Sequence, residues 1–228
     1  MTDPKLLKQY GPFCACLFVK DPAYFGFLHL GDVKTTAAMQ VVDEACAKPD
    51  AILFAPHLLT GEPNWRPHLI GAAAALILKS EPMTTALWDA IDSGSWVAPQ
   101  LIATAYLVDP DFVTSAKTRM DVRCIVEPQE DMNPIERHLA TGPAEPNERA
   151  QKNFTALLGM CRQIEDCTGW LQEIGAAETV AEWKEQNPHF FEDWGEFALD
   201  WLEKLKQAIA VRGMDLQPAF ETSGGVKT

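Results

Sequence analysis

Two segments of the chain, residues 64–78 and 95–108, repeat one pattern: a small polar residue, a tryptophan, and a proline before an apolar stretch. A small polar residue accepts a hydrogen bond from a backbone N–H of the first helical turn, and proline in that turn removes no helical hydrogen bond. Each segment is therefore predicted to start a helix at its tryptophan. Trp65 and Trp96 are separated by about the length of a helical hairpin, which favours stacked helix pairs over a sheet.

The rest of the chain also shows helical spacing. Between Thr35 and Cys46, apolar residues recur every three or four positions, with polar residues opposite them. The segments 13–19 and 24–30 fit a helix or a strand equally well by periodicity, and the surrounding helices favour a helix for the first. Similar patterns predict helices at 51–59, 65–79, 82–92, 96–108, 110–120, 147–164 and 189–211.

Helices of this length joined by short loops predict an all-α fold, an array of helical hairpins packed with a C-terminal helical bundle. Prolines and acidic residues accumulate between Glu127 and Asn147, and such a composition is typical of a loop that connects two helical regions. We therefore predict a repeat-like helical region in residues 1–123, a proline-rich connection in 124–146, a C-terminal helical region in 147–212 and a tail in 213–228.

Composition excludes several classes of function. The net charge is −13, from 19 basic and 32 acidic residues, and no basic stripe offers a nucleic-acid footprint. No apolar run reaches the roughly 18 residues of a membrane span, and the first residues do not resemble a secretory signal, so we expect a cytoplasmic protein. The six cysteines form no C-x-x-C pair and are expected to be small core residues.

Catalytic signatures are missing from the sequence. It contains no phosphate-binding glycine loop, no G-x-S-x-G elbow and no H-E-x-x-H helix, so we predict no catalytic residue, no metal and no cofactor. One enzymatic alternative stays open. His57, Arg66 and His68 are close in sequence, and they could line the pocket of a metal-dependent or small-molecule enzyme.

Three residues at the predicted helix starts are candidates for binding. Trp65 and Trp96 either wedge the hairpin corners in the core or lie on a ligand-binding edge of the array. Arg66 either pairs with a nearby acid, Glu62 or Asp92, or binds a ligand.

A second candidate surface is the acidic face of the last predicted helix. Glu192, Asp193, Glu196 and Asp200 alternate there with large aromatic residues. Such a face is either simply solvated or captures a basic partner by electrostatic steering onto aromatic anchors.

The paired tryptophan-led helix starts in residues 50–108 resemble the HEAT-type family of helical repeats. This resemblance implies a right-handed stack of hairpins used for protein binding, and it implies no catalytic residue. We therefore predict an acidic protein-binding module, such as an immunity or adaptor protein. Its predicted partner is another protein, and one version of this hypothesis is a basic toxin that the module neutralises. A structural homo-oligomer is the remaining alternative, and the sequence does not predict the oligomeric state.

Overall fold

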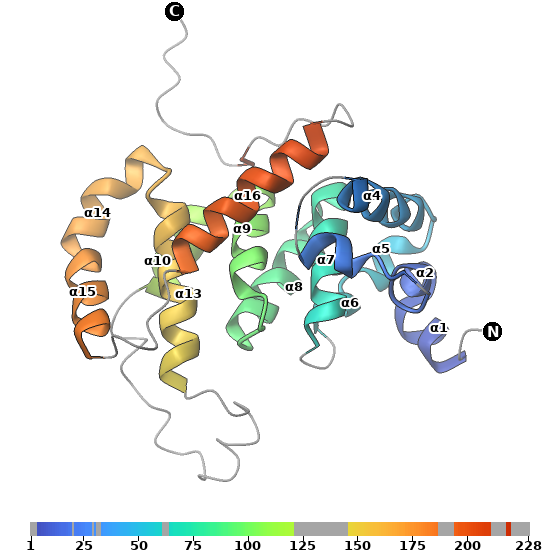
Figure 1. The fold of residues 1–228 in the computed structure, drawn as a ribbon, viewed down its shortest axis with the longest axis horizontal. Helices are drawn as coiled ribbons and strands as arrows, with labels where there is room; N and C mark the ends of the chain where they lie inside the picture. The colour runs from blue at the N-terminus through green and yellow to red at the C-terminus, as the bar shows by residue number, and fades with distance from the viewer. Residues whose placement is uncertain are drawn as a thin grey trace, which may run out of the picture.

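A computed structural model describes residues 4–19, 21–28, 30, 33–60, 64–120, 146–186, 194–210 and 218–219. Within these ranges all regular secondary structure is helical and no strand is present (Figure 1). This confirms the predicted all-α class. Most of the predicted connection and tail lie outside the described residues.

The helices of the first 60 residues are mostly short, as expected where proline and glycine are frequent. They are α1 (Pro4–Tyr10), the 3-10 helix η1 (Gly11–Phe13), α2 (Cys14–Leu17), α3 (Tyr24–Leu28), α4 (Val33–Cys46), α5 (Ala51–Phe54) and α6 (His57–Thr60). The central helices are α7 (Trp65–Leu78), α8 (Glu81–Asp92), α9 (Ala98–Val108) and α10 (Phe112–Met120). The remaining ones are α13 (Pro146–Cys161), η2 (Glu165–Cys167), α14 (Thr168–Glu173), α15 (Ala176–Gln186) and α16 (Trp194–Ala210).

Helices α7 and α9 form the centre of the molecule because they are apolar on nearly every side. Helix α7 packs against α4, α6, α8 and α9, and α9 packs in turn against α8, α13 and α16. Figure 1 shows the resulting row of helices, from α4 at one side through α7 and α9 to α13. The start of α7 is set as predicted, since the Asn64 side chain accepts a hydrogen bond of 3.2 Å from the backbone N–H of Arg66.

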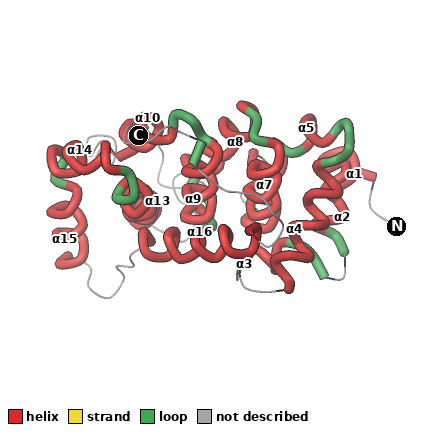
Figure 2. The backbone as a smooth tube through the Cα atoms, turned by 90° about the horizontal axis from the view of Figure 1, so that it is seen from above, coloured by secondary structure: helices red, strands yellow, loops and turns green. Residues whose placement is uncertain are grey.

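Helix α16 crosses this row and ties its two ends together. It packs on α13 and α9 and also contacts α4, and Figure 2 shows it running along one edge of the array. Its Trp201 is buried and donates an indole hydrogen bond of 3.1 Å to the carbonyl of Phe27 in α3. The crossing with α13 is close, because a Cβ atom placed on Gly159 would lie 2.6 Å from the Cα of Gly195.

The buried side chains form one continuous cluster that extends from α1 to α16. A buried carboxylate, Asp109, is satisfied inside it: its Oδ2 accepts a 2.7 Å hydrogen bond from Trp88 Nε1, and its Oδ1 accepts a 2.8 Å bond from the N–H of Asp111. The second bond caps the turn that leads into α10, as the Asp-Pro sequence predicts.

Three predicted helices differ in detail from the structure. The helix expected at 51–59 is broken into α5 and α6 around Pro56, which has no N–H to continue the helical ladder. Helix α13 begins at Pro146, so Asn147 lies in its first turn instead of preceding it. In the last helix Trp201 and Leu205 are buried as expected, but Phe197 is 39% exposed at the edge of the packed face.

The second tryptophan-led segment also starts later than predicted. Ser95 Oγ accepts a 3.3 Å hydrogen bond from the N–H of Val97, and Trp96 lies in a turn before α9 begins at Ala98. The reason is the position of the proline: Pro99 occupies one of the first two positions of α9 and so fixes the helix start next to itself. Trp96 is consequently outside the helix, and its side chain is 64% exposed.

Candidate functional site

A row of aromatic side chains lies across the starts of α7, α9 and α16, and it consists of two groups in ring contact that Lys152 bridges between Trp96 and Trp194. We call it the aromatic strip, and it is joined by two cationic side chains, Arg66 and Lys152. Its rings belong to α3, to the starts of α7 and α9, and to α16: Tyr24, Phe25, Trp65, Trp96, Trp194 and Phe197.

The spacing within the strip is that of interacting rings. The ring of Tyr24 lies 4.6 Å from that of Phe25 and packs edge-on against Trp65 at 5.6 Å between centroids. Trp65 and Trp96 follow at 5.8 Å with a tilt of 58°. These separations fall within the range in which aromatic pairs attract each other beyond simple burial. The two tryptophans singled out by the sequence are therefore direct neighbours.

Much of the strip faces solvent. Trp96 is 64% exposed and Phe25 is 55% exposed, while Trp65 and Trp194 are half-buried. The interpretation of Trp96 as a core wedge is therefore wrong. A cluster of exposed aromatic rings leaves apolar area in water without any gain for the folded chain, and such clusters mark interaction surfaces.

Arg66 lies over this surface. Its guanidinium carbon is 4.8 Å from the centroid of the Trp65 ring and 5.7 Å from that of Tyr24, so the side chain is held by cation–π contact. The predicted pairing with Asp92 is wrong, because Asp92 forms a two-pronged ion pair with Arg119, with N···O distances of 2.7 and 2.8 Å. Glu62 lies outside the described residues.

Lys152 connects the strip to the C-terminal helices. Its ammonium nitrogen is 5.8 Å from the centroid of Trp96 and 4.3 Å from that of Trp194, and it donates a hydrogen bond to the backbone carbonyl of Trp96. Trp194 packs edge-on against Phe197 at 5.8 Å. The strip therefore continues from α9 over α13 to the start of α16.

The acidic candidates lie beside this end of the strip. Glu196 and Asp200 are exposed on α16, and Asp200 forms an intrahelical ion pair of 2.6 Å with Lys204. Glu192 and Asp193 fall outside the described residues. Glu196 lies between Trp194 and Phe197 in the sequence of α16, so the described acidic candidates are on the helix that forms the end of the strip.

His57 and His68, the two histidines of the enzyme pocket considered as an alternative, have different surroundings. His57 is exposed at the start of α6, whereas His68 is 1% exposed, and its Nδ1 lies 2.7 Å from the Oγ of Ser95. Burial lowers the pKa of His68 to about 4, so its imidazole is neutral near pH 7. Among the described residues, no three His, Cys, Asp or Glu side chains are grouped so that they could hold a metal ion.

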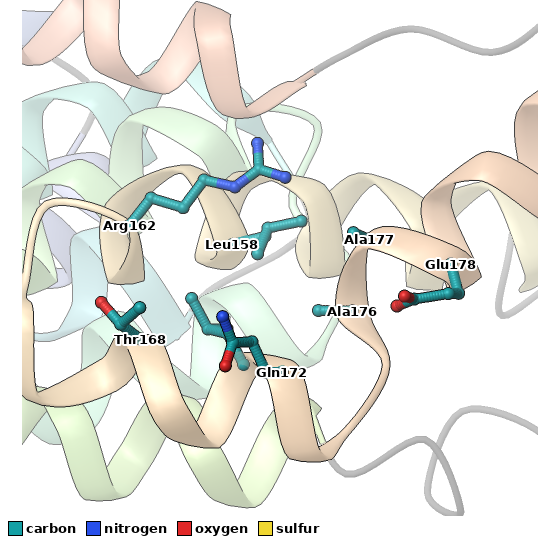
Figure 3. A pocket seen from close by; sticks show the side chains of 8 residues that line it. Leu158, Arg162, Thr168, Gln172, Ala176, Ala177 and Glu178 are labelled. Atoms are coloured by element: carbon teal, nitrogen blue, oxygen red, sulfur yellow. The ribbon is translucent and has the colours of Figure 1, made fainter.

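A hollow of about 370 Å³ lies elsewhere, between α13, α14 and α15 (Figure 3). Leu158 and Leu171 supply apolar lining, while Arg162 projects from the turn directly after α13 and Glu178 from the beginning of α15. None of these four residues belongs to a catalytic or binding motif of the sequence.

Sequence reasoning found only part of the aromatic strip. Phe25 and Tyr24 belong to a segment that the sequence marks as aromatic-rich, but no local pattern shows that it faces Trp65. Lys152 has no sequence signal at all, because its contacts with Trp96 join positions that are far apart in the chain. Trp194 and Phe197 were expected in the buried face of the last helix.

Comparison of the chain with models of known protein families, with curated proteins and with solved structures finds no match. None of the helices in the described ranges combines the length and the apolar character that crossing a bilayer requires.

Proposed function

We propose that this protein is a protein-binding module and that the aromatic strip is its binding surface. The observation that carries the proposal is the exposed Trp96 ring, which contacts the Trp65 ring at a tilt, while the Arg66 side chain lies over Trp65. Tryptophan, tyrosine and arginine are the residue types that contribute most of the binding energy at protein interfaces. An immunity or adaptor protein that holds a partner without chemistry would use such a surface, and a cytoplasmic location remains the prediction from the sequence.

The apolar area is large enough to matter for affinity. A tryptophan buries up to about 250 Å² in a complete contact. With 64% of Trp96 exposed, roughly 150 Å² is available, and covering it contributes about 4 kcal/mol of gross hydrophobic free energy, from which the entropic cost of association is subtracted. The net charge of −13 would attract the basic groups of a partner at long range, and Glu196 and the Asp200–Lys204 ion pair lie on the helix at the α16 end of the strip.

Site-specific photo-crosslinking in the cells that naturally make the protein tests this function. A benzoylphenylalanine residue would replace Phe25 or Trp96 in the strip, and Leu53 would serve as the control. Leu53 is 68% exposed in α5, so it is as accessible as Trp96 but is not one of the strip residues. We expect the same protein adduct from positions 25 and 96 and none from position 53.

A second variant tests whether the Arg66 side chain takes part in binding the partner. Arg66→Glu should abolish the adducts formed from position 25, because it removes the cation that lies on the rings. The proposal fails if positions 25 and 96 give no protein adduct, or if position 53 gives the same one.

A further inference from the structure

Arg66 is an exposed residue whose side chain lies over the rings of the strip. Its guanidinium is positioned by the faces of the Trp65 and Tyr24 rings, and among the described residues no carboxylate lies within ion-pair distance of it. Stacking uses the flat face of a guanidinium and leaves the N–H groups at its rim for other acceptors. The side chain is therefore held in place by the rings, and its donors meet no carboxylate of the part of the chain that the structure describes.

The neighbouring cation has a different role. Lys152 lies between the rings of Trp96 and Trp194 and donates to the backbone carbonyl of Trp96, so it joins α13 to the turn before α9. Arg66 is thus the cation of the strip with the geometry for two parallel hydrogen bonds to one carboxylate.

The charge of the whole protein restricts what Arg66 can bind. The net charge of −13 repels polyanions at long range, although this repulsion is screened beyond roughly 8 to 10 Å at physiological salt. A ligand with one or two carboxylates avoids most of the repulsion and still gains the contact with Arg66. The adjoining rings of Trp65 and Trp96 favour apolar groups on either side of that carboxylate.

We infer that the Arg66 end of the aromatic strip binds a linear peptide segment of a partner protein that carries an aspartate or glutamate next to aromatic or prolyl residues. The inference rests on the proposed function of the strip and adds the chemistry of its partner. The carboxylate pairs with the rim of the Arg66 guanidinium, and the neighbouring rings of the peptide cover Trp96. Proline is suitable because extended proline-containing segments dock on aromatic surfaces with little loss of entropy.

Selection from a random peptide display library on the full-length chain tests this inference. We expect the enriched peptides to contain an acidic residue within two positions of an aromatic residue or proline. Synthetic copies of these peptides should bind at least tenfold more weakly to the Arg66→Ala and Trp96→Ala variants than to the wild type. Arg162→Ala is the matched control, since Arg162 is an exposed arginine in the turn after α13 beside the separate hollow, and it should leave binding unchanged.

A charge exchange provides the most specific readout. Replacing the acidic residue of a selected peptide by lysine should abolish binding to the wild type, and Arg66→Glu should restore part of it. If the selected peptides need Trp96 but are basic or indifferent to Arg66, the inference is wrong while the strip remains a binding surface. If no peptide is enriched, or if the enriched peptides bind Trp96→Ala as well as the wild type, the inference is overturned, and the crosslinking experiment then decides separately whether the strip binds a protein.

Discussion

The close crossing of α13 and α16 leaves no room for a side chain at Gly159. Adding a methyl group to Gly159 places its Cβ 2.6 Å from the Cα and 2.8 Å from the carbonyl oxygen of Gly195. Ordinary contact begins near 3.4 Å, so the two backbones must separate by about 0.8 Å. Because both neighbours are backbone atoms, no side-chain rotation can relieve the contact. We therefore expect Gly159→Ala to move α16 away from α13 and α9.

The size of the effect follows from two opposing contributions. Overpacking a well-packed site destabilises by roughly 1 to 3 kcal/mol, and a rigid backbone contact belongs to the upper end of that range. Alanine also favours a helix over glycine by about 0.5 to 1 kcal/mol. The expected net loss is about 2 kcal/mol of the free energy of unfolding, which for a chain of this length lowers Tm by roughly 4 to 8 °C.

Gly169 provides the matched control for this experiment. It lies in α14, and a Cβ placed on it would meet no atom within 4 Å. Gly169→Ala should therefore stabilise the protein by about 0.5 to 1 kcal/mol through helix propensity alone. The three proteins would be compared by urea unfolding at 25 °C followed by far-ultraviolet circular dichroism. If Gly159→Ala is as stable as the wild type, the argument from close packing is refuted.

Other predictions concern buried polar groups and the strip. Burial lowers the pKa of His68 from about 6.5 to about 4, so the unfolded chain binds a proton more readily than the folded chain does. The contribution of neutral His68 to the free energy of unfolding is therefore complete above pH 6.5, and it falls as the pH drops toward 4. By pH 4.5 this loss is about 2 to 3 kcal/mol, and urea unfolding of His68→Asn should lack that part of the pH dependence. Asp109→Ala should destabilise by about 2 to 3 kcal/mol, since it leaves the buried Trp88 indole and a helix-starting N–H without an acceptor, while a calorimetric change below 1 kcal/mol would contradict this. Trp96→Ala should lower the free energy of unfolding by no more than about 2 kcal/mol, because only about a third of the residue's surface is buried, and a larger loss in a urea titration would show a structural role.

Local patterns predicted the helices where a short stretch of sequence decides the outcome. Asn64 caps α7 as expected, and α7 is enclosed as its uniformly apolar sequence requires. The helix start in the second tryptophan-led segment was predicted wrongly because of the position of its proline. Pro99 lies one position farther from Ser95 than Pro67 lies from Asn64. That single position moves the helix start to Ala98 and leaves Trp96 in a turn.

The candidate site was less accessible to sequence reasoning because it is made by contacts between distant segments. The prediction that Trp65, Arg66 and Trp96 share one edge rested on the repeated pattern, and the structure brings their side chains together. The roles of Tyr24 and Lys152 depend on how α3 and α13 pack against α7 and α9. Periodicity within one helix carries no information about such packing.

The hydrogen bond from Trp201 to the carbonyl of Phe27 has a consequence for the order in which the molecule is completed. During synthesis α3 emerges early, yet the indole that satisfies its carbonyl belongs to one of the last helices to be made. Contacts between such distant positions form slowly, because a long intervening loop must close first. Until α16 docks, the sides of α9 and α13 that it covers stay exposed, and exposed apolar surface of this kind makes a nascent chain prone to aggregation.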